Sequence, residues 1–154
     1  LGTYYLFAHS INWLHLLPAT ATGLLSVGVL NVNNIRDIES DRAAGKYSIP
    51  VRIGRANAVR YHWVLLGGAV VLAMAYVLLT YRSPWQFLFL LTVPLLIRNG
   101  RGVAQGGAID QYLKQMALTT LLFVLLFGLG GLTPGPLSAD GGPGVRPLLS
   151  PESY

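Results

Sequence analysis

Apolar residues run along this chain in long stretches separated by short polar connections. Four stretches are candidate membrane-spanning helices, at residues 16–32, 59–81, 84–97 and 115–132. A helix needs roughly 20 predominantly apolar residues to cross a bilayer core, so the second stretch is the clearest span. The third is short, and a tilted span is favoured over a re-entrant or buried helix. The pattern predicts an all-α, multi-pass transmembrane bundle with about four spans.

Two segments fall outside this pattern. Residues 1–8 are apolar but too short to span, and we expect them to end a helix that begins before Leu1. Residues 133–154 are rich in Pro and Gly, which predicts a disordered tail. Nothing at the start resembles a signal peptide. We therefore assign a membrane domain to residues 1–132 and expect the chain to be part of a longer protein.

Small residues are frequent in the first and last stretches. In the first stretch, the small residues should let a neighbouring helix approach closely. These residues are Ala19, Ala21, Gly23, Ser26 and Gly28. In the last, three glycines are expected to loosen the end of the helix; they are Gly128, Gly130 and Gly131.

Composition and charge support a membrane protein. Hydrophobic residues make up 53% of the chain and charged residues only 11%, whereas soluble domains carry about 25% charged residues. The net charge of +5 comes from two connections, so basic loops beside a membrane explain it better than a nucleic-acid partner. The positive-inside rule places both connections of this multi-pass protein in the cytoplasm. Their basic residues are Arg36, Arg42, Lys46, Arg52, Arg55 and Arg60, then Arg98, Arg101 and Lys114. The chain has no cysteine, which excludes a disulfide framework and a thiolate metal site.

Acidic residues at helical spacing follow the first long stretch. Asp37 and Asp41 are four residues apart, and Asn33 lies one turn earlier on the same helical face. Two neighbouring carboxylates repel each other unless a cation lies between them, and oxygen ligands one turn apart suit Mg²⁺. Because Mg²⁺ usually completes its coordination with waters and substrate phosphates, so small a ligand set predicts a phosphorylated ligand.

Basic residues in the same segment fit that ligand. Arg42 and Lys46 are again four apart, Gly45 can end the helix, and Arg52 follows in a loop. Arg binds a diphosphate bidentately, and Lys binds it as a point charge. The alternative is a solvated connection that merely obeys the positive-inside rule. Three amides at the end of an apolar helix favour a polar cavity instead; they are Asn31, Asn33 and Asn34.

At these residues the chain resembles the second aspartate-rich motif of the UbiA superfamily of intramembrane prenyltransferases, most closely the branch that prenylates 1,4-dihydroxy-2-naphthoate in menaquinone synthesis. The likeness covers most of residues 1–131. It is carried by Asn33-Asn34-Ile35-Arg36-Asp37, Asp41-Arg42, Gly45-Lys46 and Val51-Arg52-Ile53-Gly54.

The resemblance implies roughly the second half of a nine-helix bundle whose site opens to the cytoplasm. Such enzymes use Mg²⁺ held by two aspartate-rich motifs to bind a polyprenyl diphosphate. The prenyl group then alkylates the aromatic acceptor, with loss of its carboxylate as CO₂ to give demethylmenaquinone. The first motif is expected before Leu1, so this chain alone should be inactive. Carried over to this sequence, the catalytic residues are Asp37, Asp41 and Lys46, the metal ligands are Asp37 and Asp41, and the diphosphate-binding residues are Asn33, Arg36, Arg42, Lys46 and Arg52.

Other functions stay open at this stage. A sister enzyme would use another aromatic acceptor, such as 4-hydroxybenzoate. A membrane transporter could use the acidic residues as a cation pathway, although the basic cluster disfavours this. A CDP-alcohol phosphotransferase has a longer aspartate pattern, which this sequence lacks. Elsewhere, packing or interfacial roles are expected for His9, His15, His62, Trp13, Trp63 and Trp85, and exposed positions for Glu39 and Asp110.

Overall fold

The computed structural model describes residues 6, 9 and 12–132. A short 3₁₀ helix, η1 (Trp13–His15), leads into α2 (Leu16–Arg36). Two short helices follow, α3 (Ile38–Ala43) and α4 (Ile49–Ile53), and then the long α5 (Arg55–Leu79). The chain continues through a 3₁₀ helix, η2 (Pro84–Thr92), into α6 (Val93–Gln105), and then into α7 (Ile109–Leu132). The helix end expected at residues 1–8 falls almost wholly outside the described residues, and so does the tail expected at 133–154.

Four helical segments are long and apolar enough to cross a membrane. They are Trp13–Arg36, Arg55–Leu79, Pro84–Gln105 and Ile109–Leu132. The third segment has 22 residues, because the helix continues well past Ile97, where the apolar stretch ends. Its length therefore supports the span that the sequence favoured over a re-entrant helix. The described part of the chain is an all-α bundle of a multi-pass membrane protein.

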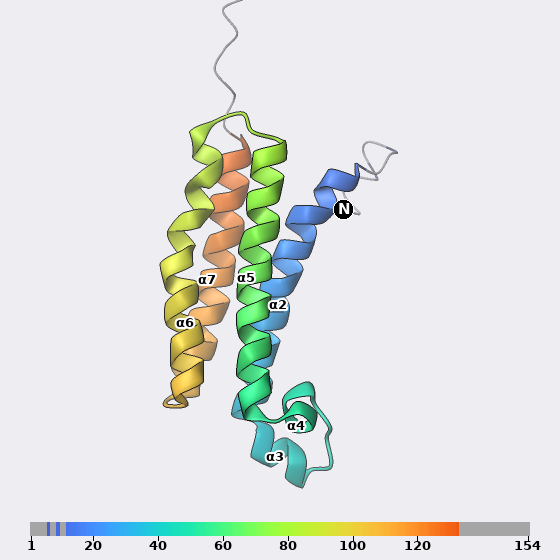
Figure 1. The fold of residues 1–154 in the computed structure, drawn as a ribbon, viewed down its shortest axis with the longest axis vertical. Coiled ribbons are helices and arrows are strands. Elements are labelled where there is room, and N and C mark those ends of the chain that lie inside the picture. The colour runs from blue at the N-terminus through green and yellow to red at the C-terminus, as the bar shows by residue number, and fades with distance from the viewer. Residues whose placement is uncertain (1–5, 7–8, 10–11, 133–154) are drawn as a thin grey trace, which may run out of the picture.

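The helices alternate in direction, which brings both basic connections to one end of the bundle (Figure 1). The segment with α3 and α4 lies at this end, as does the turn between α6 and α7. The turn between α5 and η2 lies at the opposite end. Helix α2 packs against α5 and α7, and α6 packs against α5 and α7. The N-terminal end of α2 leans away from the other three helices.

One face of α2 is buried against its neighbours. The buried side is formed by Ala21, Leu25, Gly28, Val32 and Ile35, which recur every three or four residues. A Cβ atom at Gly28 would lie 2.9 Å from the terminal methyl group of Met116 on α7, so the glycine permits a close approach. The small-residue prediction is confirmed at Ala21 and Gly28. At Ala19, Gly23 and Ser26, which are exposed in this chain, it stays a prediction.

The glycines near the end of α7 do not loosen it. The helix runs through all three to Leu132. A Cβ atom at Gly130 would lie 2.5 Å from the Trp85 carbonyl oxygen at the start of η2. Gly130 is therefore a point of close helix contact, because only a residue without a side chain fits there.

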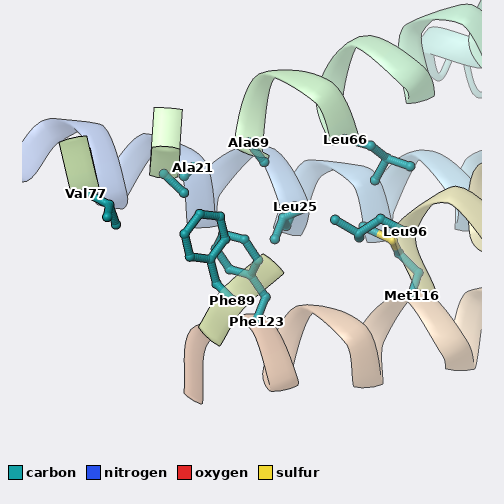
Figure 2. Close-up of a cluster of buried hydrophobic side chains, with 10 residues drawn as sticks. Ala21, Leu25, Leu66, Ala69, Val77, Phe89, Leu96, Met116 and Phe123 are labelled. Carbon is teal, nitrogen blue, oxygen red and sulfur yellow. The ribbon is translucent and has the colours of Figure 1, made fainter. Parts of the chain in front are cut away.

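The core between the helices is built from apolar side chains of all four spans (Figure 2). The Phe89 ring on η2 meets the Phe123 ring on α7 edge to face, with centroids 5.5 Å apart. This is a favourable arrangement for an aromatic pair.

Polar side chains are also buried, while large apolar ones face outward. His62, Thr92 and Asn99 are fully buried, whereas Val64 is 68% exposed and Leu118 is 67% exposed. A surface of this kind suits lipid as the surrounding solvent, and each buried polar group inside it needs a partner.

Candidate functional site

The acidic segment, from Asn33 to Arg52, includes the point where α2 bends into α3. Asp37 forms the joint, with φ −95° and ψ 11°. Its N–H still donates to the Asn33 carbonyl (3.1 Å), and the Asp41 N–H donates to the Asp37 carbonyl (2.8 Å). Because this i to i−4 pattern passes through the joint, Asn33, Asp37 and Asp41 remain one turn apart, as their spacing predicts. The sequence did not indicate the bend itself.

Asp37 is held in a polar cluster at the end of α2. Arg36 binds both carboxylate oxygens, with Nε 2.7 Å from Oδ1 and Nη2 3.0 Å from Oδ2. The Asn33 amide donates to Oδ2 at 3.4 Å and its oxygen accepts from Arg36 Nη2 at 3.0 Å. The Arg36 guanidinium holds the pKa of the Asp37 carboxyl below its usual value, against the opposing effect of desolvation. Asp37 is therefore ionised at neutral pH.

The same arginine reaches across to α7. Arg36 Nη1 lies 3.0 Å from Asp110 Oδ1, in the first turn of that helix. The Asp110 side chain is 74% exposed, as the sequence predicts, yet the ion pair joins two elements 74 residues apart. Asp110 thus belongs to the same cluster as Asp37. The sequence offered little sign of this contact beyond an acidic residue in the second basic connection.

Asp41 has a different environment, because it is buried within α3. Lys46 Nζ lies 3.1 Å from its Oδ1, while Oδ2 is buried and has no partner among the described residues. Gly45, at φ 69°, follows the end of α3. The Lys46 N–H donates to the Asp41 carbonyl (2.8 Å) and the Gly45 N–H donates to the Arg42 carbonyl (3.1 Å). This Schellman motif turns the chain so that Lys46 returns to Asp41.

Arg42 and Arg52 are not brought to the two aspartates. Arg42 pairs with Glu39 at 3.5 Å, and both side chains are exposed. Arg52 Nε donates to the Tyr47 carbonyl at 3.1 Å. Within the described residues, the cations at the carboxylates are Arg36 and Lys46. Diphosphate binding by Arg42 and Arg52 stays a prediction.

Arg55 is tied to the end of α6 instead of the acidic segment. Its Nη2 donates to the Val103 carbonyl at 3.2 Å, and Gly106, at φ 77°, leaves room for the guanidinium. A cation at a helix C-terminus is favourable because unpaired carbonyls gather there.

A buried polar network links α5, α6 and α7. His62 Nε2 lies 3.0 Å from Asn99 Oδ1. The Nδ2 atom of Asn99 donates to the Tyr112 carbonyl at 2.7 Å. Asn31, one of the three amides noted in the sequence, donates to the Ala58 carbonyl at 3.0 Å. The packing role expected for His62 agrees with this burial. Asn99 was not recognised from the sequence, because it stands among arginines and looked like part of a loop.

The described residues contain no group of three or more His, Cys, Asp or Glu side chains that could hold a metal ion. Asp37 and Asp41 would have to be completed by ligands from elsewhere, such as phosphate oxygens and water.

A family model described as the UbiA prenyltransferase family matches residues 1–104. The chain belongs to this family. The matched residues include the whole acidic segment from Asn33 to Arg52. The resemblance drawn from the motif is confirmed at the level of the family.

Curated relatives support this family membership. The chain is 45% identical, over 132 residues, to a 1,4-dihydroxy-2-naphthoate octaprenyltransferase of Escherichia coli (strain K12); the match covers 81% of this chain and 43% of the relative. It is 37% identical to the protein of the same name from Mycobacterium tuberculosis (strain ATCC 25618 / H37Rv), covering 90% of this chain and 47% of the relative. The chain thus spans less than half the length of these relatives. No solved structure shows a significant match.

Proposed function

We propose that this chain supplies one aspartate-rich half of the active site of a prenyltransferase, which is completed by an upstream half of the same protein. The whole enzyme transfers a polyprenyl group from polyprenyl diphosphate to 1,4-dihydroxy-2-naphthoate, leading to demethylmenaquinone. The names of the relatives support this donor and acceptor. The observation that carries the proposal is the buried Asp41, whose Oδ2 lacks a partner one turn from the ionised Asp37.

The acidic segment fits a magnesium ion. A buried carboxylate oxygen without a partner is costly, and a hard cation would satisfy it. Asp41 and Asp37 would hold the ion, with Asn33 supporting Asp37 through its amide. Bound Mg²⁺ stabilises the negative charge that develops on a departing diphosphate.

Arg36 and Lys46 would bind the diphosphate itself. The Lys46 side chain is 62% exposed and the Arg36 side chain 37% exposed, so both can turn from a carboxylate to a phosphate. In the reaction, the allylic carbon–oxygen bond breaks and its electron pair leaves with the diphosphate. The allylic cation alkylates the naphthoate ring, whose carboxylate leaves as CO₂. The two side chains would hold the released charge in place while these bonds change.

The proposed location is the bacterial inner membrane, with the acidic segment on the cytoplasmic side. The two basic connections lie at the same end of the bundle, which supports this orientation under the positive-inside rule. A cation pathway is disfavoured, because the positive charges of Arg36 and Lys46 beside the carboxylates would repel a cation that arrives without a phosphate group.

A chimera tests the proposal. Residues 1–132 replace the equivalent half of the Escherichia coli relative, and membranes are assayed with octaprenyl diphosphate and either 1,4-dihydroxy-2-naphthoate or 4-hydroxybenzoate. We expect a prenylated, decarboxylated dihydroxynaphthalene, whose formation stops with a chelator and resumes with Mg²⁺. Asp37→Asn or Asp41→Asn should lower the rate on the order of 100-fold, the scale for losing one electrostatic contact in a transition state.

Glu39→Gln is the matched control, because Glu39 lies on the same short helix but its side chain is 85% exposed. This variant should keep the parent rate. Undiminished activity in both aspartate variants would overturn the assignment of the site. Product from 4-hydroxybenzoate alone would instead refute the acceptor.

A further inference from the structure

Two arginines near the end of α6 line a pocket that is separate from the acidic segment. Arg98 and Arg101 are three residues apart and therefore share a face of the helix. With Gln105 and Tyr112 they line a depression of about 500 Å³ between α6 and α7. The Tyr112 ring lies directly against Gly102, where a Cβ atom would overlap it, and this contact holds the pocket wall in place.

The charge of this pocket is not compensated. Within the described residues Arg98 and Arg101 make no ion pair and no side-chain hydrogen bond, whereas Arg36, Lys46 and Arg42 each pair with a carboxylate. The described residues that line the pocket include no Asp or Glu. The pocket therefore suits an anion that is bound without a metal ion.

An apolar groove meets the same pocket. It has a volume of about 270 Å³ and runs between α5 and α6, past Trp63, Val71 and Leu96. Ile97 lines both the groove and the arginine pocket, so the two depressions adjoin at that residue. Gly67 lines the groove, and a Cβ atom there would meet nothing within 4 Å, so the groove is open at this position.

The arginine pocket and the groove lie at a depth in the bundle that suits a membrane lipid. The arginines lie near the end of a membrane-spanning segment, at the same end as the two basic connections. Lipid phosphates lie at that depth, and basic pockets between membrane helices bind anionic head groups there. The groove extends from this level toward the middle of the span, as an acyl chain does.

We propose that the pocket and groove together bind an anionic phospholipid of the surrounding bilayer. Its phosphate lies between Arg98 and Arg101, and one acyl chain lies along the groove past Trp63. A polyprenyl diphosphate fits less well, because its magnesium would find no carboxylate in this pocket. The proposal does not depend on the reaction that the whole protein catalyses.

Trp63 provides a direct reporter, since it lines the groove and is 38% exposed. The chain has three tryptophans, so Trp13→Phe together with Trp85→Phe leaves Trp63 as the sole fluorophore. This variant is reconstituted in phosphatidylcholine vesicles that contain a small fraction of phosphatidylglycerol or phosphatidylcholine with brominated acyl chains. We expect brominated phosphatidylglycerol to quench Trp63 at a concentration lower by on the order of tenfold.

Three further variants separate charge from shape. Arg98→Gln with Arg101→Gln should abolish the preference for phosphatidylglycerol, whereas Arg98→Lys with Arg101→Lys should keep part of it. Gly67→Leu should reduce quenching by both lipids, because its side chain fills the groove. Arg60→Gln is the matched control, since Arg60 is an exposed arginine on α5 at the same end of the bundle and lies outside the pocket.

Several results would overturn the proposal. Equal quenching by the two brominated lipids would remove the role of charge. Absence of quenching by either lipid would show that another part of the protein covers the groove. Loss of the preference on adding millimolar inorganic diphosphate would show a general phosphate site in place of a lipid site. An undiminished preference in the double Gln variant would refute the role of the two arginines.

Discussion

Replacing Gly130 by alanine should force η2 and α7 apart. The new Cβ atom would lie 2.5 Å from the Trp85 carbonyl oxygen and 2.9 Å from the Gln86 Cα atom. Nonbonded heavy atoms prefer separations of about 3.5–4.0 Å, so the two backbones must move apart by roughly 1 Å. No side-chain rotation can relieve the contact, because both neighbouring atoms belong to the backbone.

The cost follows from the packing that is lost. A gap of roughly 0.5–1 Å removes about a quarter to a half of the dispersion energy between facing atoms. Overpacking of this kind typically costs about 1–3 kcal/mol, and the better helix propensity of alanine returns up to about 1 kcal/mol. Gly130→Ala should therefore lower the free energy of unfolding by up to about 2 kcal/mol. Gly128→Ala should raise it by up to about 1 kcal/mol, since nothing lies within 4 Å of the new methyl group.

The measurement is unfolding in mixed micelles of a mild detergent and dodecyl sulfate, followed by circular dichroism. The two variants place the same methyl group on the same helix, so their difference isolates the contact with η2. Equal stability of Gly130→Ala and Gly128→Ala would refute the close contact.

Three other substitutions should separate the polar contacts. Asn99→Leu should lower the free energy of unfolding by about 1–2 kcal/mol in the same micelles, because the buried His62 Nε2 loses its hydrogen-bond partner. Arg36→Gln should raise the pKa of Asp37 toward its usual value, because Arg36 is the main cause of its lowering. Carboxyl ¹³C NMR of the labelled aspartate measures this titration. Asp110→Asn should speed amide hydrogen exchange in the first turn of α7 and change stability by less than about 1 kcal/mol, since the pair is exposed.

Each of these three substitutions has its own control or refuting result. For Asn99, a Gln substitution keeps an amide and should be less harmful than Leu; equal losses would argue against the hydrogen bond. For Asp37, the lowered pKa means that its ion pair with Arg36 stabilises the folded protein fully above the usual aspartate pKa near 3.9. This stabilisation is lost as the pH falls through the lower pKa of the folded state. A titration that Arg36→Gln leaves unchanged would contradict that cause. For Asp110, exchange that stays at the parent rate would show that the ion pair does not hold the turn.

Local periodicity was enough to predict much of this molecule. Long apolar stretches predict the four spans, because burying backbone polar groups in lipid requires helices. The four-residue spacing of Asn33, Asp37 and Asp41 places them one turn apart, since that relation depends only on helical geometry. The turn at Gly45 follows from its tolerance of positive φ. The chemical roles of these residues remain predictions.

Contacts between distant segments could not be read from the sequence. The pairing of Arg36 with Asp110, the burial of Asn99 against His62 and the contact of Gly130 with Trp85 depend on how each helix is rotated and where two helices cross. Those quantities are set by how all the side chains pack at once, and no local pattern encodes them. The sequence by itself therefore determined which segments enter the membrane and which residues share a turn. Only the tertiary structure decided that Arg36 and Lys46 are the cations at the two aspartates, because side-chain direction depends on the bend at Asp37 and the return of the chain at Gly45.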